Sequence, residues 1–425
     1  MLGWVTTLPL LLVALVKSTS IADSATLTPT WDPTAPDAPP RPRPLSFPAA
    51  VELRARRGLY AEPAPAWAAE YSNTILVTAA NFAYRDMLAN WECAASSLGL
   101  QWVVVALDQE LFDFLGPERA VMTTGEELSG TQHFETGGFN VISCNKLHAV
   151  RNFLAAGADV VFSDPDNVFL KDPFRPGEEL GLMIRQGIDY VYTANLPARF
   201  MWPSNGMVAQ HFGDPAAKAH GWTTGERGLM ICATGDIEDE GNTGLHYMRA
   251  LAEQGIPLFD KAIARCGTHP EKDDQTNFWV ELHQIKTSHC TKTYQSNGLV
   301  QLDIPNKPGY MSACCLDPRT YIAGGRVAKS DPSVVAYHAN WVTGKPKKIL
   351  KLKNDAPQPG LWFLEAGEGT DADARHMTEY RLDSCDSHGL RPIDEPSNLA
   401  AMRTVDKVCT LYFVWNKLSL TRNCG

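Results

Sequence analysis

The chain has 425 residues, a formal net charge of −10 at pH 7 and ten cysteines. This length accommodates one large α/β domain or two ordinary domains with an ample core. The acidic balance argues against a nucleic-acid partner, because a general nucleic-acid binder presents a basic face. No spacing between the cysteines matches a zinc site, and the cysteines fit disulfides if the chain enters the secretory pathway.

The N-terminal region predicts entry into that pathway. Residues 1–16 are almost entirely apolar, and no basic residue precedes them. About sixteen helical residues span roughly 24 Å, which is less than the ~30 Å hydrocarbon core of a bilayer. Residues 1–20 therefore fit either a cleaved signal peptide or a short type II signal anchor that holds the protein at a membrane.

A proline-rich region follows, because ten of the 29 prolines lie between Pro29 and Pro65. This composition predicts an extended, poorly ordered stem over residues 21–70. A stem after an N-terminal apolar segment fits a protein of the Golgi lumen, either membrane-bound or secreted. A propeptide or a cell-wall linker would have the same composition.

The first part of the expected catalytic domain alternates between strands and helices. Residues 73–80 (NTILVTAA) predict a buried strand, and residues 84–99 predict an amphipathic helix that ends in glycine. Residues 101–108 (QWVVVALD) predict a second strand, which a short helix over residues 109–115 follows. This alternation predicts an α/β fold with a mostly parallel, Rossmann-like nucleotide-binding sheet and flanking helices. Three residues at the end of the first strand are expected at its ligand edge, near a base or ribose, unless they form an ordinary turn: Thr78, Ala79 and Asn81.

Two carboxylates end the next buried strand. Residues 139–157 predict a helix that carries Lys146, and residues 158–162 predict a strand that stops abruptly before Asp164 and Asp166. Open α/β sheets bind their ligands at the carboxyl ends of their strands. A hard divalent cation takes oxygen ligands and completes its shell with phosphate oxygens, so the pair predicts a metal-bound nucleotide diphosphate. The alternative is that the two aspartates only cap the following turn.

Further polar residues follow along the chain. Residues 189–195 predict a strand, and residues 235–245 predict a loop that leads through Asn242 into a helix or strand. Asp274 and Gln275 open a predicted helix that runs to about residue 285, where acidic residues also complement the helix dipole.

A late predicted strand over residues 334–339 carries His338, and Gly344 and Lys345 follow it. A neutral imidazole can bind a metal, a glycine allows close approach, and an ammonium can bind phosphate. With Asp164 and Asp166, His338 would give two oxygen ligands and one nitrogen ligand, a set that suits Mn²⁺ or Mg²⁺.

These residues lie within an ordered series of motifs: ILVTAANFAYRDMLANW, VVVALD, VVFSDPDNVFLKDPF, NTGLHYMR, DDQTNFW and HANWVTGKPKK. The series resembles the nucleotide-diphospho-sugar transferases of glycosyltransferase family 77, the plant, algal and slime-mould group of arabinosyl-, xylosyl- and galactosyltransferases. The resemblance implies a GT-A type fold over residues 71–363, a UDP-sugar donor, Mn²⁺ and retention of the anomeric configuration. It also implies a glycan or hydroxyproline-rich glycoprotein as the acceptor.

The resemblance also implies roles for individual residues. Asp164 resembles the carboxylate near the ribose and metal, Asp166 the principal metal ligand, and His338 the C-terminal metal ligand. Gly344 and Lys345 are similar to diphosphate contacts, and Lys146 and Asn242 to donor-sugar contacts. The catalytic pair beneath the sugar ring is similar to Asp274 with Gln275.

Two other function classes remain open at this point. A catalytically inactive glycan-binding or scaffold protein would keep the fold without using the metal and phosphate residues. A secreted phosphohydrolase would need more metal ligands than the motifs supply. Residues 364–425 lie outside the resemblance and carry three cysteines, which suggests a small disulfide-tied extension.

Overall fold

The structure is a computed structural model of the whole chain. It describes residues 46–362 except 62, 128, 132–136, 195–240, 295–299, 304–306, 318–319, 325–332, 341, 343 and 355–360. The expected signal segment (1–20), most of the expected stem and the expected C-terminal extension (364–425) therefore lie outside the described residues. Among the described residues, no helix combines the length and the apolar character needed to cross a membrane.

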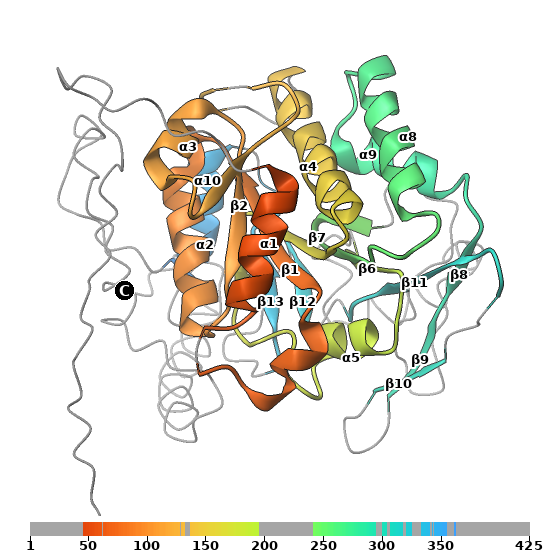
Figure 1. The fold of residues 1–425 in the computed structure, drawn as a ribbon. Coiled ribbons are helices and arrows are strands. Elements are labelled where there is room, and N and C mark those ends of the chain that lie inside the picture. Colours follow the sequence, from red (N-terminus) through yellow and green to blue (C-terminus); the bar gives the residue numbers. More distant parts are fainter. Residues whose placement is uncertain are drawn as a thin grey trace, which may run out of the picture.

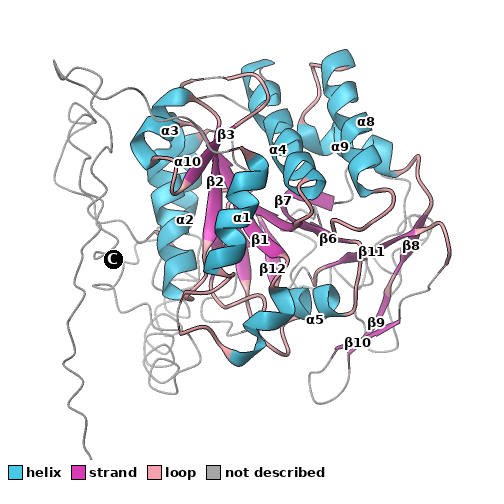
Figure 2. Ribbon diagram, viewed as in Figure 1, coloured by secondary structure: helices cyan, strands magenta, loops and turns pink. Residues whose placement is uncertain are grey.

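An eight-stranded sheet forms the centre of the described fold (Figures 1 and 2). Its strands, in spatial order, are β3 (Ala120–Met122), β2 (Trp102–Ala106), β1 (Thr74–Ala80), β4 (Asp159–Ser163), β7 (Gly241–Met248), β6 (Tyr190–Ala194), β11 (Met311–Cys315) and β8 (Thr287–His289). Only β7 runs antiparallel to its neighbours β4 and β6 within this sheet. The expected mostly parallel α/β sheet is therefore confirmed.

Helices cover both faces of the sheet, because alternate residues of each buried strand point to opposite faces. Leu76 of β1 belongs to one apolar cluster, whereas its neighbours Ile75 and Val77 belong to the other. The first cluster includes residues of α2 (Arg85–Ser97), α3 (Gln109–Leu115) and α5 (Glu179–Arg185). The second includes residues of α1 (Phe47–Arg57), α4 (Gly137–Ala155), α8 (Gly255–Thr268) and α9 (Asp274–Leu282). Figure 1 shows α4, α8 and α9 side by side.

A second, three-stranded sheet is formed by β12 (Tyr321–Ala323), β13 (Ala336–His338) and β5 (Asn167–Phe169). Helix α10 (Lys345–Asn354) packs on this sheet through the fully buried Leu352. The remaining described elements are a hairpin of β9 (Thr291–Tyr294) with β10 (Val300–Asp303), and two short 3₁₀ helices, η1 (Ala66–Tyr71) and η2 (Phe82–Tyr84).

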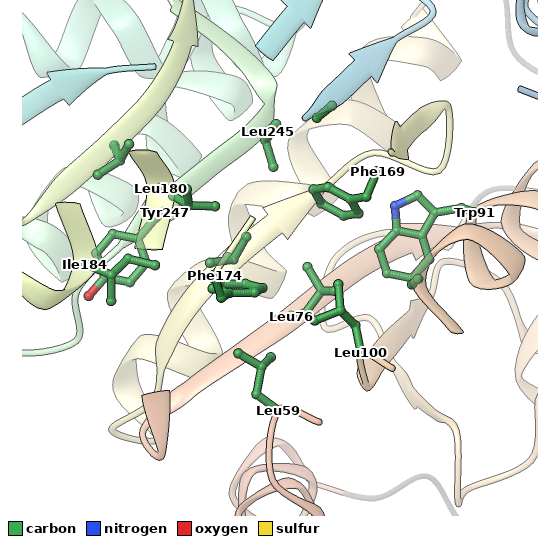
Figure 3. Packing of buried hydrophobic residues seen from close by; sticks show 14 of the residues in the cluster. Leu59, Leu76, Trp91, Leu100, Phe169, Phe174, Leu180, Ile184, Leu245 and Tyr247 are labelled. Carbon is green, nitrogen blue, oxygen red and sulfur yellow. The ribbon is translucent and has the colours of Figure 1, made fainter. Parts of the chain in front are cut away.

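Apolar core residues connect the large sheet to the small sheet next to the turn that carries Asp164 and Asp166. Figure 3 shows Trp91 of α2 and Phe169 of β5 close to Leu76 of β1. The ring centroids of Trp91 and Phe169 are 6.4 Å apart, and Trp91 Nε1 donates a hydrogen bond of 2.9 Å to Ser163 Oγ. The residue that immediately precedes Asp164 is therefore held by the rigid core, and this positions the turn that follows.

Two expectations differ from the structure. The extended stem does not extend over the whole of 21–70, because residues 47–57 form α1, and Phe47 packs edge-on against Phe153 of α4 with ring centroids 4.6 Å apart. Residues 241–245 are not a loop, because they open strand β7. The register with β6 shifts between Tyr192 and Thr193, so that Tyr192 pairs with His246 but Thr193 pairs with Asn242. The intervening residues form a bulge, which explains their loop-like composition.

The remaining predicted elements are confirmed with small changes at their ends. The first two strands, the helices at 85–97, 109–115 and 137–155, and the strands at 159–163 and 190–194 all form close to the expected positions. Two disulfides join described cysteines, Cys144 to Cys266 between α4 and α8, and Cys290 to Cys314. The expectation of disulfides is therefore confirmed.

Candidate active site

The turn after β4 places the two aspartates at the carboxyl end of the central sheet. Ser163 pairs with Leu245 of β7, and the Asp164 amide then donates a hydrogen bond of 2.7 Å to Gly244 O. The Asn167 amide donates to Asp164 O at 3.0 Å, which closes the turn and starts β5. The two carboxylates therefore lie between the large sheet and the small sheet.

Pairing between β5 and β13 brings His338 to this turn. His338 is directly opposite Asn167, and the Ala339 amide donates to Asp166 O at 2.9 Å. His338 Nε2 lies 3.2 Å from Asp166 Oδ1 and 3.9 Å from Asp164 Oδ2. One nitrogen of His338 and one oxygen from each aspartate all lie within 4.8 Å of one another.

This triad fits a divalent cation. The side chains of Asp166 and His338 are 3% and 6% exposed, and that of Asp164 is 16% exposed. Among the described residues, His338 Nδ1 has no hydrogen-bond partner, and Nε2 faces the carboxylate oxygen of Asp166 at 3.2 Å without good hydrogen-bond geometry. A buried imidazole that faces two carboxylate oxygens matches a mixed oxygen and nitrogen ligand set.

A glycine of β7 packs directly against the triad. A Cβ atom on Gly244 would lie 2.3 Å from His338 Cε1 and 2.9 Å from Asp164 Oδ2. These distances are shorter than van der Waals contact, so only glycine fits here while the triad keeps its geometry. The bulged backbone of β7 therefore forms one wall of the site.

Lys146 and Asp274 extend the site next to the triad. Lys146 Nζ, from α4, lies 3.2 Å from Asp164 Oδ1 and 3.0 Å from Asp274 Oδ2. Thr243 Oγ1 donates a hydrogen bond of 2.7 Å to the same Asp274 oxygen. Asp274 is the first residue of α9, where Asp273 caps the helix by accepting from the Thr276 amide. The ammonium of Lys146 thus bridges the triad of Asp164, Asp166 and His338 and the start of α9.

The amide side chains form a second layer of contacts. Gln275 Oε1 accepts hydrogen bonds from Asn242 Nδ2 at 3.2 Å and from the Thr243 amide at 3.4 Å. His246 adds a further contact to this layer, because its Nδ1 lies 3.0 Å from Thr243 O. Burial lowers the pKa of His246 to about 4. His246 is therefore neutral at pH 7 and donates Nδ1–H to the carbonyl of the bulge.

Charges within the site determine the protonation of its members. Burial raises the pKa of the Asp164 carboxyl in spite of Lys146 nearby. For Asp166 burial also acts to raise the pKa, but Lys348 and His338 outweigh it and hold the pKa well below its usual range. Burial acts to lower the pKa of Lys146, but Asp164 and Asp274 raise it above its usual value. Lys146 and Asp166 are therefore charged at neutral pH.

The family comparison matches this region of the chain. The sequence model of the family described as nucleotide-diphospho-sugar transferase matches residues 100–352, which is more than half of the chain. The chain belongs to this family. The match includes Lys146, both aspartates of the turn and His338, and it agrees with the mostly parallel sheet of a GT-A type glycosyltransferase fold.

Solved structures resemble this chain weakly. GlyE, a glycosyltransferase from Streptococcus pneumoniae, is 12% identical with a TM-score of 0.29, and the match covers 59% of this chain and 46% of GlyE. The galactosyltransferase LgtC is 11% identical with a TM-score of 0.32, and the match covers 62% of this chain and 86% of LgtC. The chain thus spans less than half of the length of GlyE. No curated protein matches the sequence of the chain.

The fold brings together seven of the residues that the sequence predicted for the site. These residues are connected through the contacts described above: Lys146, Asp164, Asp166, Asn242, Asp274, Gln275 and His338.

The other predicted residues have different surroundings. Thr78 and Ala79 lie at the end of β1, the strand next to β4, and Asn81 Nδ2 donates to Gly130 O at 2.8 Å. Gly344 has a left-handed φ of 84° and precedes α10. Lys345 Nζ contacts Ala83 O at 2.6 Å and Asp86 Oδ1 at 2.8 Å, so its ammonium does not join the triad.

Three residues of the site were not predicted from the sequence. Lys348 Nζ lies 2.5 Å from Asp166 Oδ2, Thr243 holds Asp274, and His246 supports the bulge. Lys348 is one of five lysines in α10, and the sequence has no signal that separates it from the other four. Thr243 and His246 stand in the motif NTGLH, which was expected to be partly a loop.

Proposed function

We propose that the protein is a metal-dependent, retaining glycosyltransferase that moves a sugar from a UDP-sugar to a glycan or glycoprotein acceptor. The observation that carries this proposal is the buried triad of Asp164, Asp166 and His338 within a family of nucleotide-diphospho-sugar transferases. A buried histidine that faces two carboxylates matches the metal site that donor chemistry requires. The ordered motifs further support membership of glycosyltransferase family 77.

The triad would hold Mn²⁺ or Mg²⁺ together with the diphosphate of the donor. When bound, the cation would neutralise the negative charge that develops on the departing diphosphate. Asp164 and Asp166 would supply oxygens and His338 a nitrogen, which favours Mn²⁺ over the more strictly oxygen-binding Mg²⁺.

Lys146 and Asp274 are placed to act on the donor sugar. Both carboxylate partners of Lys146 are buried or nearly so, and the ammonium is thereby fixed at the boundary between the metal triad and α9. Asp274 Oδ2 accepts from both Lys146 and Thr243, so this carboxylate has a fixed orientation. A fixed carboxylate stabilises positive charge on the sugar ring as the bond to UDP breaks.

Retention follows from a front-face route in this proposal. The acceptor hydroxyl attacks from the face that UDP leaves, and the departing phosphate takes the acceptor proton. Gln275 keeps its amide oriented because Asn242 and Thr243 both donate to its oxygen. Direct attack by Asp274 on the sugar carbon is the less favoured route, because the oxygen Oδ2 already accepts two hydrogen-bond donors.

The donor sugar in the proposal is a pentose or galactose, and the acceptor is a glycan or a hydroxyproline-rich glycoprotein. The proposed location is the lumen of the Golgi apparatus, either anchored by residues 1–20 or secreted. The disulfide between Cys144 and Cys266 supports an oxidising compartment. The proposed context is synthesis of a cell wall or extracellular glycan.

The test is UDP release by the purified protein from a panel of UDP-sugars, with and without Mn²⁺. The proposal predicts slow Mn²⁺-dependent release from one donor, and no release by Asp166→Asn, which keeps the size of the side chain. NMR of the product anomer then tests retention. Failure to bind UDP under any condition would favour the non-catalytic glycan-binding protein, and release of sugar phosphate would indicate a phosphohydrolase.

A further inference from the structure

Lys348 is held against the metal triad by helix α10. Its ammonium lies 2.5 Å from Asp166 Oδ2, and its side chain is 23% exposed. The helix itself is fixed, because Leu352 is fully buried and its carbonyl accepts a hydrogen bond of 2.8 Å from the Leu361 amide. The flexible side chain of Lys348 allows its ammonium to change position while the helix stays in place.

The contact of Lys348 competes with a divalent cation for one carboxylate. Asp166 contacts His338 through Oδ1 and Lys348 through Oδ2, so a cation bound to this carboxylate lies within a few ångströms of the ammonium. A divalent cation repels the ammonium with twice the force of a unit charge, and the low dielectric constant around the buried Asp166 screens this repulsion poorly. Each cation therefore weakens the contact of the other with Asp166, and the two compete for this carboxylate.

The charges of the site identify the next partner of the ammonium. Three carboxylates (Asp164, Asp166 and Asp274) and two ammonium groups (Lys146 and Lys348) give the cluster a net charge of 2 − 3 = −1. A divalent cation and a diphosphate with two negative charges leave this sum unchanged. The diphosphate would thus bring anionic oxygens to the site, to which the displaced ammonium can turn.

We propose that Lys348 is a built-in counter-cation that exchanges partners during donor binding. Its ammonium neutralises Asp166 until a divalent cation binds there, and it then turns to a phosphate oxygen of the nucleotide diphosphate. Lys348 thereby weakens the binding of the metal alone and strengthens the binding of metal and nucleotide together. The contact of Lys348 with a phosphate rests on the proposed function, because it needs a nucleotide. The competition between Lys348 and the metal does not depend on a sugar donor.

The experiment measures two affinities of Lys348→Met, which keeps the length of the side chain without its charge. Calorimetry with Mn²⁺ alone should show binding about tenfold tighter than in the wild type, because the competitor is absent. Calorimetry with UDP in saturating Mn²⁺ should show binding about tenfold weaker, because a charged phosphate contact is lost. A lysine that only stabilises the fold would not move the two affinities in opposite directions.

The matched control is Lys347→Met, one residue earlier on the exposed side of α10. It should leave both affinities within about twofold of the wild type, because surface charges are well screened. Lys348→Arg, which keeps the positive charge, should retain the weak Mn²⁺ binding of the wild type. A Lys348→Met protein whose Mn²⁺ affinity does not rise, or whose UDP affinity does not fall, overturns the inference.

A second measurement uses the wild type alone, in case Lys348→Met does not fold. Reductive methylation followed by mass spectrometry reports the accessibility of each lysine. Mn²⁺ alone should increase the labelling of Lys348 relative to Lys347, and UDP added with Mn²⁺ should decrease it again. Labelling that Mn²⁺ leaves unchanged overturns the inference. Wild-type protein that responds to Mn²⁺ but never binds UDP contradicts the proposed function and leaves the competition with the metal intact.

Discussion

Replacement of Gly244 by alanine tests the wall of the site that β7 forms. The added Cβ would lie 2.3 Å from His338 Cε1 and 2.8 Å from Asn242 Oδ1. Carbon atoms in contact stay about 3.5–4.0 Å apart, so the His338 ring or the strand must move by about 1 Å. The ring is buried and packed, and its backbone is held in β13, so this movement distorts the triad itself.

The expected magnitude follows from the tolerance of metal sites. Ligand distances in such sites vary by about 0.2 Å, so a shift of about 1 Å removes His338 as an effective ligand. We expect Mn²⁺ affinity to fall about 10–100-fold, as when a residue that orients a ligand is lost. Overpacking should also lower the free energy of unfolding by about 1–3 kcal/mol. Calorimetric titration with Mn²⁺ and chemical denaturation measure the two effects.

The control for this prediction is Gly267→Ala in α8. A Cβ on Gly267 meets no atom within 4 Å, so alanine should raise the free energy of unfolding by up to about 1 kcal/mol and leave Mn²⁺ affinity unchanged. Wild-type Mn²⁺ affinity in a folded Gly244→Ala protein would refute the close packing of β7 against the triad.

Three further predictions concern parts of the fold that support the site. His246 has its pKa lowered from 6.5 to about 4, so the unfolded chain binds a proton that the folded chain does not between these pH values. The free energy of unfolding should therefore fall by about 3 kcal/mol as the pH drops from 6.5 to 4. His246→Gln should make the free energy of unfolding less dependent on pH in this range. The same pH dependence in thermal unfolding of both proteins would contradict this prediction. Cys144 and Cys266 form a disulfide and are 122 residues apart in the sequence. Replacement of both by serine should therefore lower the free energy of unfolding by about 4–5 kcal/mol, and an unchanged melting temperature would disprove this. Thr243→Val removes the hydroxyl that donates to Asp274 and should lower the free energy of unfolding by about 1–2 kcal/mol in urea; no change would show that the hydrogen bond is dispensable.

The sequence predicted the strand ends of the site because hydrophobic runs stop where the polar residues begin. The run before Asp164 is short and rich in valine, which favours a buried strand, and parallel strands bring their carboxyl ends to one edge. Asp274 and Gln275 were expected at a helix start, and Asp273 indeed caps that helix. Local pattern was sufficient at these positions.

Strand β7 could not be predicted locally, because Gly241, Asn242 and Gly244 all disfavour strands. This strand forms because it is buried between β4 and β6, and a Cβ at Gly241 would lie 1.9 Å from the Trp279 ring. Its glycines are set by close tertiary packing, a constraint that has no local signature in the sequence.

The identity of the lysine that contacts the triad is also set by tertiary packing and not by the local sequence. The motif led to the expectation that Lys345 would contact the diphosphate, and the structure places Lys345 on Asp86 and Lys348 on Asp166. Which lysine reaches the carboxylate is set by the rotation of α10 about its axis. That rotation is fixed by the packing of Leu352, which lies in a cluster with residues of the small sheet.

The most direct test of the account is the dependence of UDP binding on Mn²⁺ in the wild type and in His338→Ala. The account predicts that UDP binds the wild type tightly only when Mn²⁺ is present, and that His338→Ala loses most of this Mn²⁺-dependent affinity. A folded His338→Ala protein with wild-type UDP affinity in Mn²⁺, or a wild type that binds UDP equally well without any divalent cation, would contradict it.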